Sequence, residues 1–340
     1  MGKINSNTNY QKSGVDLDKA ANLKENMKSI LSSHQEVDNI GNFGGLFEIK
    51  GYKNPVLISS TDGVGSKLLI HAELKKFKSL GIDLVNASIN DIVCIGANPL
   101  FFLDYIAVEK IIEHDLLEII KGIVNACEDN NCKLVGGETA QMSEVYTNGK
   151  FDLAGFIVGI AEKNEIKNKS NTEEGDILIG LPSNGIHTNG YTLVRKVFDI
   201  ENNSKILHHY FTELGTTLGE ELTKTHISYY ASINKIKDLM KISAHITGGG
   251  FYENIPRVIN SNLNAVINYD SLNIPPIFKL IQNNGNILEK EMFNVFNMGT
   301  GLVIVAPKEN VDKILSLCSE ASIIGFLESN STNESEVLIK

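Results

Sequence analysis

The spacing of hydrophobic and polar residues predicts alternating strands and helices in the first half of the chain. Short apolar runs predict strands at residues 56–60, 101–108, 133–135 and 153–160. Apolar residues recur at helical spacing from Ile82 to Ile92 and again from Leu116 to Val124. This alternation is typical of mixed α/β structure.

A polar stretch at residues 163–176 separates this first half from a second one. The second half has apolar runs that predict strands at residues 177–181 and 302–305, and helical patterns that follow Tyr191 and Phe251. We therefore expect an α/β (α+β) protein with two mixed α/β domains. Their expected bounds are residues 1–165 and 172–340.

Composition and charge limit the size of the core, the kinds of partner and the cellular location that we expect for this protein. The chain has 340 residues, of which 42% are hydrophobic, so it can bury the cores of about two domains. Its net charge is -10 and it has no block of Lys and Arg, which makes nucleic acid an unexpected partner. The apolar runs are too short to span a membrane. Its four cysteines have no metal-ligand spacing, which predicts a reduced, cytoplasmic location.

Residues 61–67 read TDGVGSK and follow the first predicted strand directly. Gly63 and Gly65 carry no side chain, so backbone N–H groups there can approach an anion. Asp62 can hold a hard cation, and Lys67 can neutralise phosphate. The spacing is not that of a Walker loop, and a tight turn capped by Asp62 remains an alternative interpretation.

Two further acids follow apolar segments and are candidates for the same cation. Asp91 flanks a polar stripe of Asp83, Asn86 and Asn90 on the helix predicted near residue 81, and Glu138 follows the strand at 133–135. Mg²⁺ favours a few carboxylates together with substrate phosphates and water, so Asp62, Asp91 and Glu138 are the expected metal ligands. The alternative is that these acids are solvated or cap a helix.

Two glycine-containing loops of the second half are suited to anions. Residues 183–190 read SNGIHTNG and residues 246–250 read ITGGG, and each loop leads into a predicted helix. His187 lies in the first loop and is a candidate ligand or acid–base group. A helix C-terminal turn or close packing would also explain the glycines. His245 lies in an apolar strand, where we expect a core role.

Taken in order, these segments resemble the phosphoribosylformylglycinamidine cyclo-ligase family over roughly 300 residues. The resembling stretches are SGVDLD (13–18), STDGVGSKL (60–68), GIDLVNASINDIV (81–93), GANPLFFLDY (96–105), LVGGETAQM (134–142), FDLAGFIVG (151–159), GIHTNGYTLVRK (185–196), HITGGGFYENIPRV (245–258) and EMFNVFNMGTG (291–301). The aspartate loop is shared with relatives such as selenophosphate synthetase and thiamine-phosphate kinase.

The resemblance implies ATP-dependent closure of the imidazole ring of aminoimidazole ribonucleotide from formylglycinamidine ribonucleotide. It also implies a homodimer whose N-terminal sheets pair, with ATP and Mg²⁺ as cofactors, while a requirement for K⁺ stays open. The expected catalytic residues are Asp62, Lys67, Asp91 and His187. The expected nucleotide-binding residues are Lys28, Gly63, Gly65, Ser66, Asn90, Asn189, Gly190, Gly248, Gly249 and Gly250.

Three segments depart from the family pattern. Residues 10–14 read YQKSG, residues 141–144 carry Gln141 where the family has a glutamate, and residues 225–228 carry His226 where a guanidinium is lost. These departures keep two alternatives open: a related ATP-dependent phosphotransferase, or a nucleotide-binding homologue without activity. The sequence gives the altered segments no catalytic role.

Overall fold

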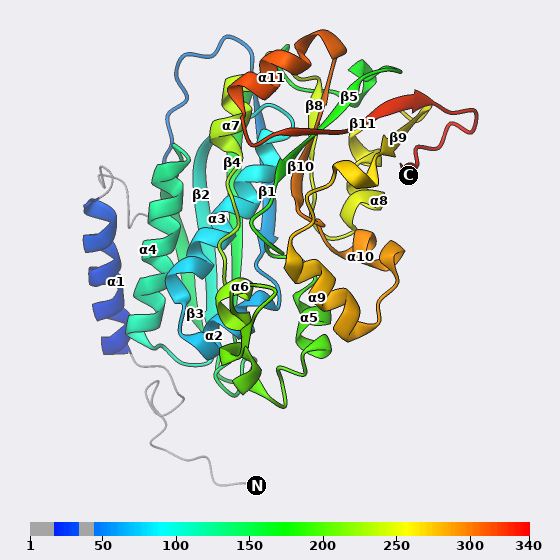
Figure 1. Cartoon of the computed structure of the whole chain (residues 1–340). Coiled ribbons are helices and arrows are strands. Elements are labelled where there is room, and N and C mark those ends of the chain that lie inside the picture. The colour runs from blue at the N-terminus through cyan, green and yellow to red at the C-terminus, as the bar shows by residue number, and fades with distance from the viewer. Residues whose placement is uncertain (1–16, 34–43) are drawn as a thin grey trace, which may run out of the picture.

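Two β-sheets lie side by side and are flanked by helices in the computed structural model of the chain (Figure 1). The structure describes residues 17–33 and 44–340. The altered segment at residues 10–14 lies outside the described residues.

The first sheet has the strand order β1-β4-β2-β3. Its strands are β1 (Pro55–Gly63), β2 (Asn98–Val108), β3 (Lys133–Gln141) and β4 (Phe151–Glu162). Strand β4 pairs antiparallel with β1 and β2, and β2 pairs parallel with β3. All four strands predicted for this half are confirmed, and each is longer than its apolar run.

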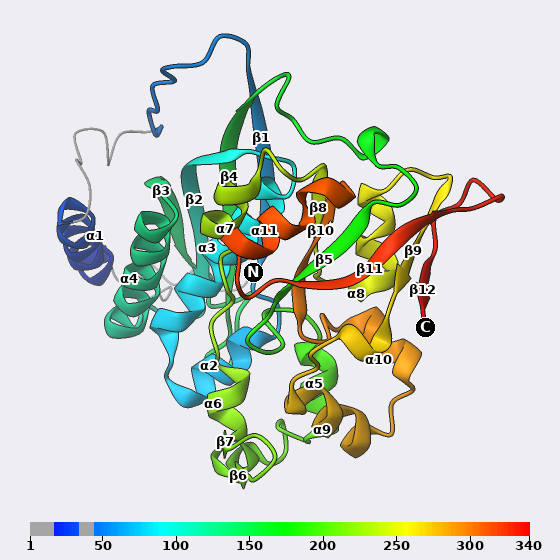
Figure 2. The same ribbon diagram turned by 45° about the horizontal axis from the view of Figure 1, so that its top comes forward.

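Four helices belong to the first half, and they are α1 (Leu17–Ser32), α2 (Lys67–Leu74), α3 (Phe77–Val93) and α4 (Glu113–Asp129). Helices α3 and α4 cover one face of the first sheet, and α1 packs on the outer side of α4 (Figures 1 and 2). Both predicted helical patterns are confirmed, since they fall within α3 and α4.

The second sheet has the strand order β12-β9-β11-β5-β10-β8. Its strands are β5 (Ile177–Pro182), β8 (Ile242–His245), β9 (Leu263–Ile267), β10 (Thr300–Ala306), β11 (Ser322–Ser329) and β12 (Val337–Ile339). All neighbours pair antiparallel except β12 and β9. A small ribbon joins β6 (Tyr210–Phe211) to β7 (Thr216–Thr217).

Short helices connect the strands of the second half. They are α5 (Tyr191–Val197), α6 (Leu218–Leu222), α7 (Tyr230–Ile236), α8 (Gly250–Asn254), α9 (Pro276–Gly285), α10 (Glu289–Val295) and α11 (Val311–Leu317). The 3-10 turns are η1 (Lys169–Asn171), η2 (Ser204–His208), η3 (Pro256–Val258), η4 (Tyr269–Ser271) and η5 (Lys308–Asn310). Among the described residues, none of these helices has the length and apolar character needed to cross a membrane.

Helix α3 lies at the centre of the molecule, between the first sheet and the second half of the chain (Figure 1). Its apolar residues, such as Leu84 and Ile89, belong to a core that continues through Ile233 of α7 to Ile179 of β5 and Ile304 of β10. The two halves therefore share apolar packing, which leaves the polar side of α3 facing the second half.

Candidate active site

The polar stripe of α3 binds the backbone of a segment from the second half of the chain. Asp83 Oδ1 accepts a hydrogen bond from the His226 backbone N–H at 2.6 Å, and Asn86 Nδ2 donates to the His226 carbonyl at 2.7 Å. Asn90 donates to the Ile227 carbonyl and accepts from the Tyr229 N–H. These side chains satisfy backbone groups that burial would otherwise leave unpaired. The stripe thus fixes residues 226–229 against the first half.

Lys67 is fully buried and forms an ion pair with Asp83. Its Nζ lies 2.7 Å from Asp83 Oδ2 and donates to the Lys224 carbonyl at 2.8 Å, and both side chains have 0% exposure. Burial lowers the pKa of Lys67 and raises that of Asp83, while their mutual attraction opposes both shifts. The expectation that Lys67 neutralises phosphate does not fit this geometry, because no solvent reaches its ammonium.

Asp62 and Asp91 lie on facing elements at one edge of the first sheet. Asp62 is exposed near the end of β1, and Asp91 is half-buried on α3. Asp62 keeps exposed surface, but the surrounding chain removes part of its hydration and so raises its pKa, and the negative charge of Asp91 adds to that shift. Two carboxylates that repel one another in this way are suited to share a cation.

Glu138 is not brought to this pair. In the first sheet Gly63, Ala154, Tyr105 and Glu138 form one row across four strands, and Asp62 lies in the next row. Because adjacent rows point to opposite faces, Glu138 and Asp62 are on different sides of the sheet and about 14 Å apart along it. The three acids therefore do not converge within one chain, although Asp62 and Asp91 do.

A chain of buried side chains extends from Asp91 into the second half. Asp91 Oδ1 lies 2.9 Å from Nδ1 of His245, and Nε2 of His245 lies 3.0 Å from Nε2 of His226. Nδ1 of His226 lies 3.2 Å from the hydroxyl of Thr188. Asp91 Oδ2 also accepts a hydrogen bond from Ser60 at 2.9 Å. Burial alone raises the pKa of Asp91, but the hydrogen bond and charge of His245 lower it below its ordinary value.

His187 lies against this chain rather than in open space. Its ring stacks on that of His226 at 4.0 Å between centroids, and both of its ring nitrogens are buried without a hydrogen-bond partner among the described residues. Its φ of 64° is unusual for a residue with a side chain. Burial lowers the pKa of His187 well below its usual value, so the ring is neutral. A role in proton transfer remains a prediction.

The aspartate loop and the first glycine loop meet in a groove of about 480 Å³. Gly65 and Ser66 line it from the first half, and Thr188, Asn189 and Gly190 line it from the second. The Ser66 hydroxyl lies 2.9 Å from that of Thr192, which joins the aspartate loop to α5. Four of the predicted nucleotide-binding residues, Gly65, Ser66, Asn189 and Gly190, therefore share one groove.

The second glycine loop adjoins this groove. A Cβ added to Gly248 would lie 3.4 Å from Asn189 Oδ1, so the two loops are in contact. Asn254 holds the turn, because its Nδ2 lies within hydrogen-bond distance of the carbonyls of Thr247, Gly248 and Gly250. Gly249 and Gly250 have φ values of 87° and 54°, which favour glycine.

Three other predicted nucleotide-binding residues, Asn90, Gly63 and Lys28, do not line the groove. Asn90 is buried and binds the 226–229 segment instead of facing a ligand. Gly63 donates its N–H to Asp62 Oδ1 at 2.7 Å and so shapes the aspartate loop. Lys28 is exposed on α1, which lies on the outer side of the first half (Figure 1).

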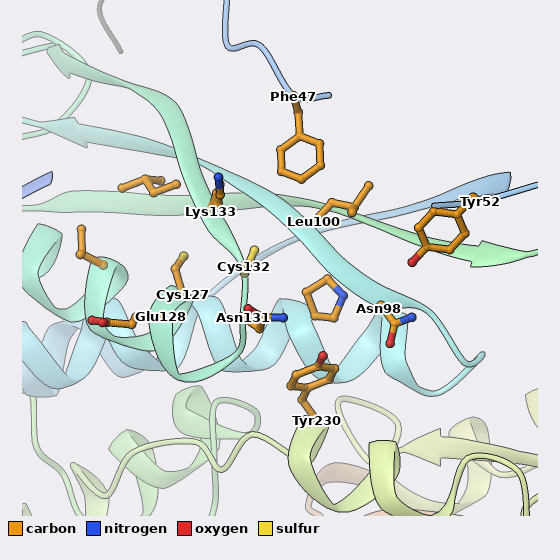
Figure 3. Close-up of a pocket in the computed structure, with 13 residues that line it drawn as sticks. Phe47, Tyr52, Asn98, Leu100, Cys127, Glu128, Asn131, Cys132, Lys133 and Tyr230 are labelled. Carbon is orange, nitrogen blue, oxygen red and sulfur yellow. The ribbon is translucent and has the colours of Figure 1, made fainter. Parts of the chain in front are cut away.

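A second pocket, of about 560 Å³, contains none of the predicted site residues (Figure 3). It lies where β2 and β3 begin and where α4 ends, and Phe47, Asn98, Cys127 and Tyr230 are among its lining residues. Because Asp62 lies near the opposite end of the same sheet, we centre the candidate site on the groove and the Asp62–Asp91 pair.

Sequence reasoning missed the central position of His226 and His245. The first was read as a departure without a role, and the second as a core residue. The one available signal was position, since His245 directly precedes the ITGGG loop and His226 lies within an altered family segment. Neither position reveals that the two rings meet.

Both halves match family models. Residues 45–161 match "AIR synthase related protein, N-terminal domain", and residues 173–336 match the corresponding C-terminal domain. The phosphoribosylformylglycinamidine cyclo-ligase of Thermoanaerobacter sp. (strain X514) is 48% identical over 311 residues, which cover 90% of this chain and 92% of the relative. That of Caldanaerobacter subterraneus subsp. tengcongensis is 45% identical over 322 residues, or 94% of this chain and 96% of the relative.

Solved structures share the fold at low identity. Thiamine-monophosphate kinase from Stenotrophomonas maltophilia K279a has a TM-score of 0.66 and 14% identity, covering 94% of this chain and 95% of that one. The hydrogenase maturation protein HypE in complex with ATP has a TM-score of 0.64 and 12% identity, covering 93% and 91%. At such low identities the comparison shows a shared fold and nothing more.

Proposed function

The chain belongs to the phosphoribosylformylglycinamidine cyclo-ligase family, ligases of purine biosynthesis, and from this premise we propose how its site acts. It converts formylglycinamidine ribonucleotide to aminoimidazole ribonucleotide, with ATP giving ADP and phosphate. The observation that supports this site most directly is the groove where loops of both halves meet, which Thr188, His226 and His245 link to Asp91.

The reaction needs positioning and charge neutralisation more than a protein nucleophile. The terminal phosphoryl group of ATP passes to the formyl oxygen of the substrate. The amidine nitrogen that bears the ribose then attacks the activated carbon, the C–O bond to phosphate breaks, and the nitrogen loses a proton. Because both reacting groups belong to one substrate, the site only has to hold them together.

Backbone N–H groups of the glycine loops are the groups that would bind the phosphates. Gly65, Asn189 and Gly190 present backbone at the groove, and Gly65 and Gly190 have positive φ values. Such loops let a phosphate approach without side-chain obstruction. Arg257, whose charge acts on Asp91, contributes positive potential on the same side.

Asp62 and Asp91 are the residues that would hold Mg²⁺. Asp62 Oδ1 accepts from Gly63, and Asp62 Oδ2 has no hydrogen-bond partner among the described residues. Asp91 uses one lone pair of each oxygen, for His245 and for Ser60, and keeps the others. This donor set fits a cation completed by water and phosphate oxygens, which would neutralise charge on the transferred group. Glu138 has no part in it within one chain.

We also propose a homodimer formed through the uncovered face of the first sheet. Helices α3 and α4 cover the other face, while Leu57, Tyr105 and Phe156 are 55%, 39% and 40% exposed on this one. Large apolar side chains on one flat face favour a second copy of the same face. A cytoplasmic location completes the proposal, because all four cysteines are buried free thiols.

A substrate panel tests the proposed reaction. The purified protein is incubated with ATP, Mg²⁺ and one acceptor at a time, and ADP and phosphate are measured. We expect release of both with formylglycinamidine ribonucleotide and none with thiamine phosphate. Stimulation by thiamine phosphate would instead indicate a related phosphotransferase, and tight ATP binding without turnover would indicate a homologue that lost the reaction. Omitting K⁺ in parallel shows whether that ion is needed.

A further inference from the structure

The ring of His226 contacts four side chains, which come from three separate segments of the site. Its neighbours are Asn90 on α3, Thr188 in the first glycine loop, His187 beside it and His245 at the end of β8. We propose that His226 is a positioning residue for the ring-closing reaction, which holds His245 against Asp91 on one side and Thr188 of the groove on the other. This inference rests on the proposed function.

The orientation of Asn90 fixes the tautomer of His226. Asn90 Oδ1 accepts from the Tyr229 N–H at 2.9 Å, and its Nδ2 donates to the Ile227 carbonyl at 2.8 Å. The same Nδ2 lies 3.1 Å from Nε2 of His226, so this ring nitrogen is an acceptor. His226 is neutral, because burial lowers its pKa well below the usual value. Its proton is therefore on Nδ1, which donates to the hydroxyl of Thr188.

This tautomer also decides how His226 holds His245. Since Nε2 of His226 has no proton, its single lone pair faces both Asn90 Nδ2, at 3.1 Å, and the Nε2–H of His245, at 3.0 Å, and the two donors share it. The opposite nitrogen of His245 lies 2.9 Å from Asp91 Oδ1. The ring of His245 is thus held at both ends, and its angle to the Asp91 carboxylate depends on His226.

The backbone of His226 is fixed independently of its ring. Its N–H donates to Asp83 and its carbonyl accepts from Asn86, at 2.6 and 2.7 Å. Asp83 is itself paired with Lys67 in the helix that follows the aspartate loop. A side chain that touches the reacting groups keeps its geometry only if its neighbours are locked, and His226 is locked from both backbone and ring.

A histidine with only a structural role in the core would need burial and hydrogen-bond partners, but no connection to the site. His226 differs, because its two ring nitrogens connect Asp91, proposed to face the metal and phosphates, to Thr188, which lines the groove from the other half. Displacing the ring would change the position of Asp91 relative to the glycine loop. Such misplacement costs on the order of 10²-fold in rate when reacting groups are held for an intramolecular step.

Two substitutions of His226 separate positioning from simple filling of space. His226→Phe keeps a ring that can stack on His187 but removes all the ring hydrogen bonds. His226→Gln keeps an amide oxygen to accept from Asn90 and His245 and an amide nitrogen to donate to Thr188. His208→Phe serves as the matched control, because His208 is exposed on η2 and is not among the residues that line the groove.

We expect His226→Phe to lower kcat about 10²-fold and to change KM for ATP less than about threefold, because the groove itself is intact. His226→Gln should restore kcat to within about tenfold of the parent value. The control His208→Phe should have the same kcat as the parent enzyme. A His226→Phe enzyme with normal kcat would overturn the proposal. So would a His226→Gln enzyme as impaired as His226→Phe, since a packing role alone would then explain both.

Nitrogen-15 spectra of the histidine rings give a readout that does not depend on turnover. The parent protein should show a neutral histidine with its proton on Nδ1, absent from His226→Phe and shifted in Thr188→Val, with Thr188→Ser as the conservative control. The His245 resonances should move in His226→Phe. A proton on Nε2 of His226 would contradict the assignment. If the parent protein does not convert the ribonucleotide, the proposed function fails, while these spectra still decide whether His226 holds both neighbours. If His226→Phe does not fold, the spectra of the parent protein, Thr188→Val and Thr188→Ser still test the position of the His226 proton.

Discussion

At the level of single residues, burial separates the charged groups that a ligand can reach from those that hold the structure together. Lys67 and Asp83 have no exposed surface and neutralise one another, whereas Asp62 is exposed near the end of β1. A buried ion pair is costly to break, because the remaining charge is left without compensation. The same lysine-and-aspartate chemistry that suggested phosphate binding therefore stabilises the contact between the two halves.

Asp62→Asn tests the assignment of the exposed acid. The change removes a charge but little volume, so we expect the free energy of unfolding to stay within about 0.5 kcal/mol of the parent value. Turnover should fall about 10²- to 10³-fold, as for loss of one group that stabilises charge in the transition state. Steady-state ADP release and urea unfolding measure the two effects. Asp312→Asn, in exposed α11, is the control, and normal turnover in Asp62→Asn would refute the metal assignment.

Asp104 predicts a dependence of stability on pH. It is buried in β2 with one carboxylate oxygen unpaired, and burial, aided by the charge of Glu138, raises its pKa from 3.8 to about 7. Between these values the folded state keeps a proton that the unfolded state has released. The contribution of Asp104 to the free energy of unfolding therefore falls as pH rises from about 4 to about 7, and is constant above.

Asp104→Asn removes this titration. We expect the free energy of unfolding of the variant, relative to the parent, to increase between pH 4 and pH 7 by no more than about 4 kcal/mol. Urea unfolding at several pH values measures the difference, and Asp312→Asn shows the background. A difference that does not change with pH would mean that Asp104 titrates near its ordinary value in the folded protein.

At the level of elements, α3 has two roles that follow from its two sides. Its apolar side packs on the first sheet and α4, and its polar side binds residues 226–229 and carries Asp91. The crossing with α4 is very close, because Gly81 and Gly122 face one another. The polar stripe that binds residues 226–229 thus lies opposite a close helix contact on α3.

Gly122→Ala tests this contact. In an isolated helix the change would be favourable by about 1 kcal/mol, but here the new Cβ would lie 2.0 Å from the Lys78 carbonyl oxygen. Since backbone cannot give way easily, we expect a net loss of about 1–3 kcal/mol in the free energy of unfolding. Thermal and urea unfolding measure it. Gly44→Ala, with nothing within 4 Å of the added Cβ, should be neutral, and a stabilised Gly122→Ala protein would refute the close crossing.

At the scale of the whole molecule, the candidate site exists only where the two halves meet. The first half supplies Asp62, Asp91 and Ser66, and the second supplies Thr188 and His245. Neither sheet alone builds the groove. The uncovered face of the first sheet lies on the side away from α3, so the proposed pairing of two copies would leave Asp62 and Asp91 undisturbed on the covered side.

Leu57→Glu combined with Phe156→Glu tests the homodimer. Both residues lie on the uncovered face, so two added charges on each copy should oppose pairing. Light scattering with size-exclusion chromatography should give twice the 37.3 kDa chain mass for the parent protein and a single chain for the variant. Leu288→Glu, 78% exposed in the second half, should remain a dimer. A parent protein that elutes as a single chain would contradict the proposal.

Much of the fold could be predicted from local pattern. The predicted strands at 56–60, 153–160 and 177–181 lie within β1, β4 and β5, because alternating or continuous apolar residues reflect which faces are covered. The loop predicted at residues 61–67 is shorter in the structure, because residues 61–63 continue β1 and Lys67 begins α2. These features depend on neighbours within about ten residues, which the sequence displays directly.

Tertiary structure alone decided which of the candidate groups meet. His226 lies against Asp83 across 143 residues, and His245 lies against Asp91 across 154. Glu138, by contrast, is only one row from Asp62 in the sheet register and still points to the other face. Residue type and spacing determined the chemistry available to this protein. Burial and distance, which depend on how remote segments pack, determined that Lys67 is structural and that two unassigned histidines lie at the centre of the site.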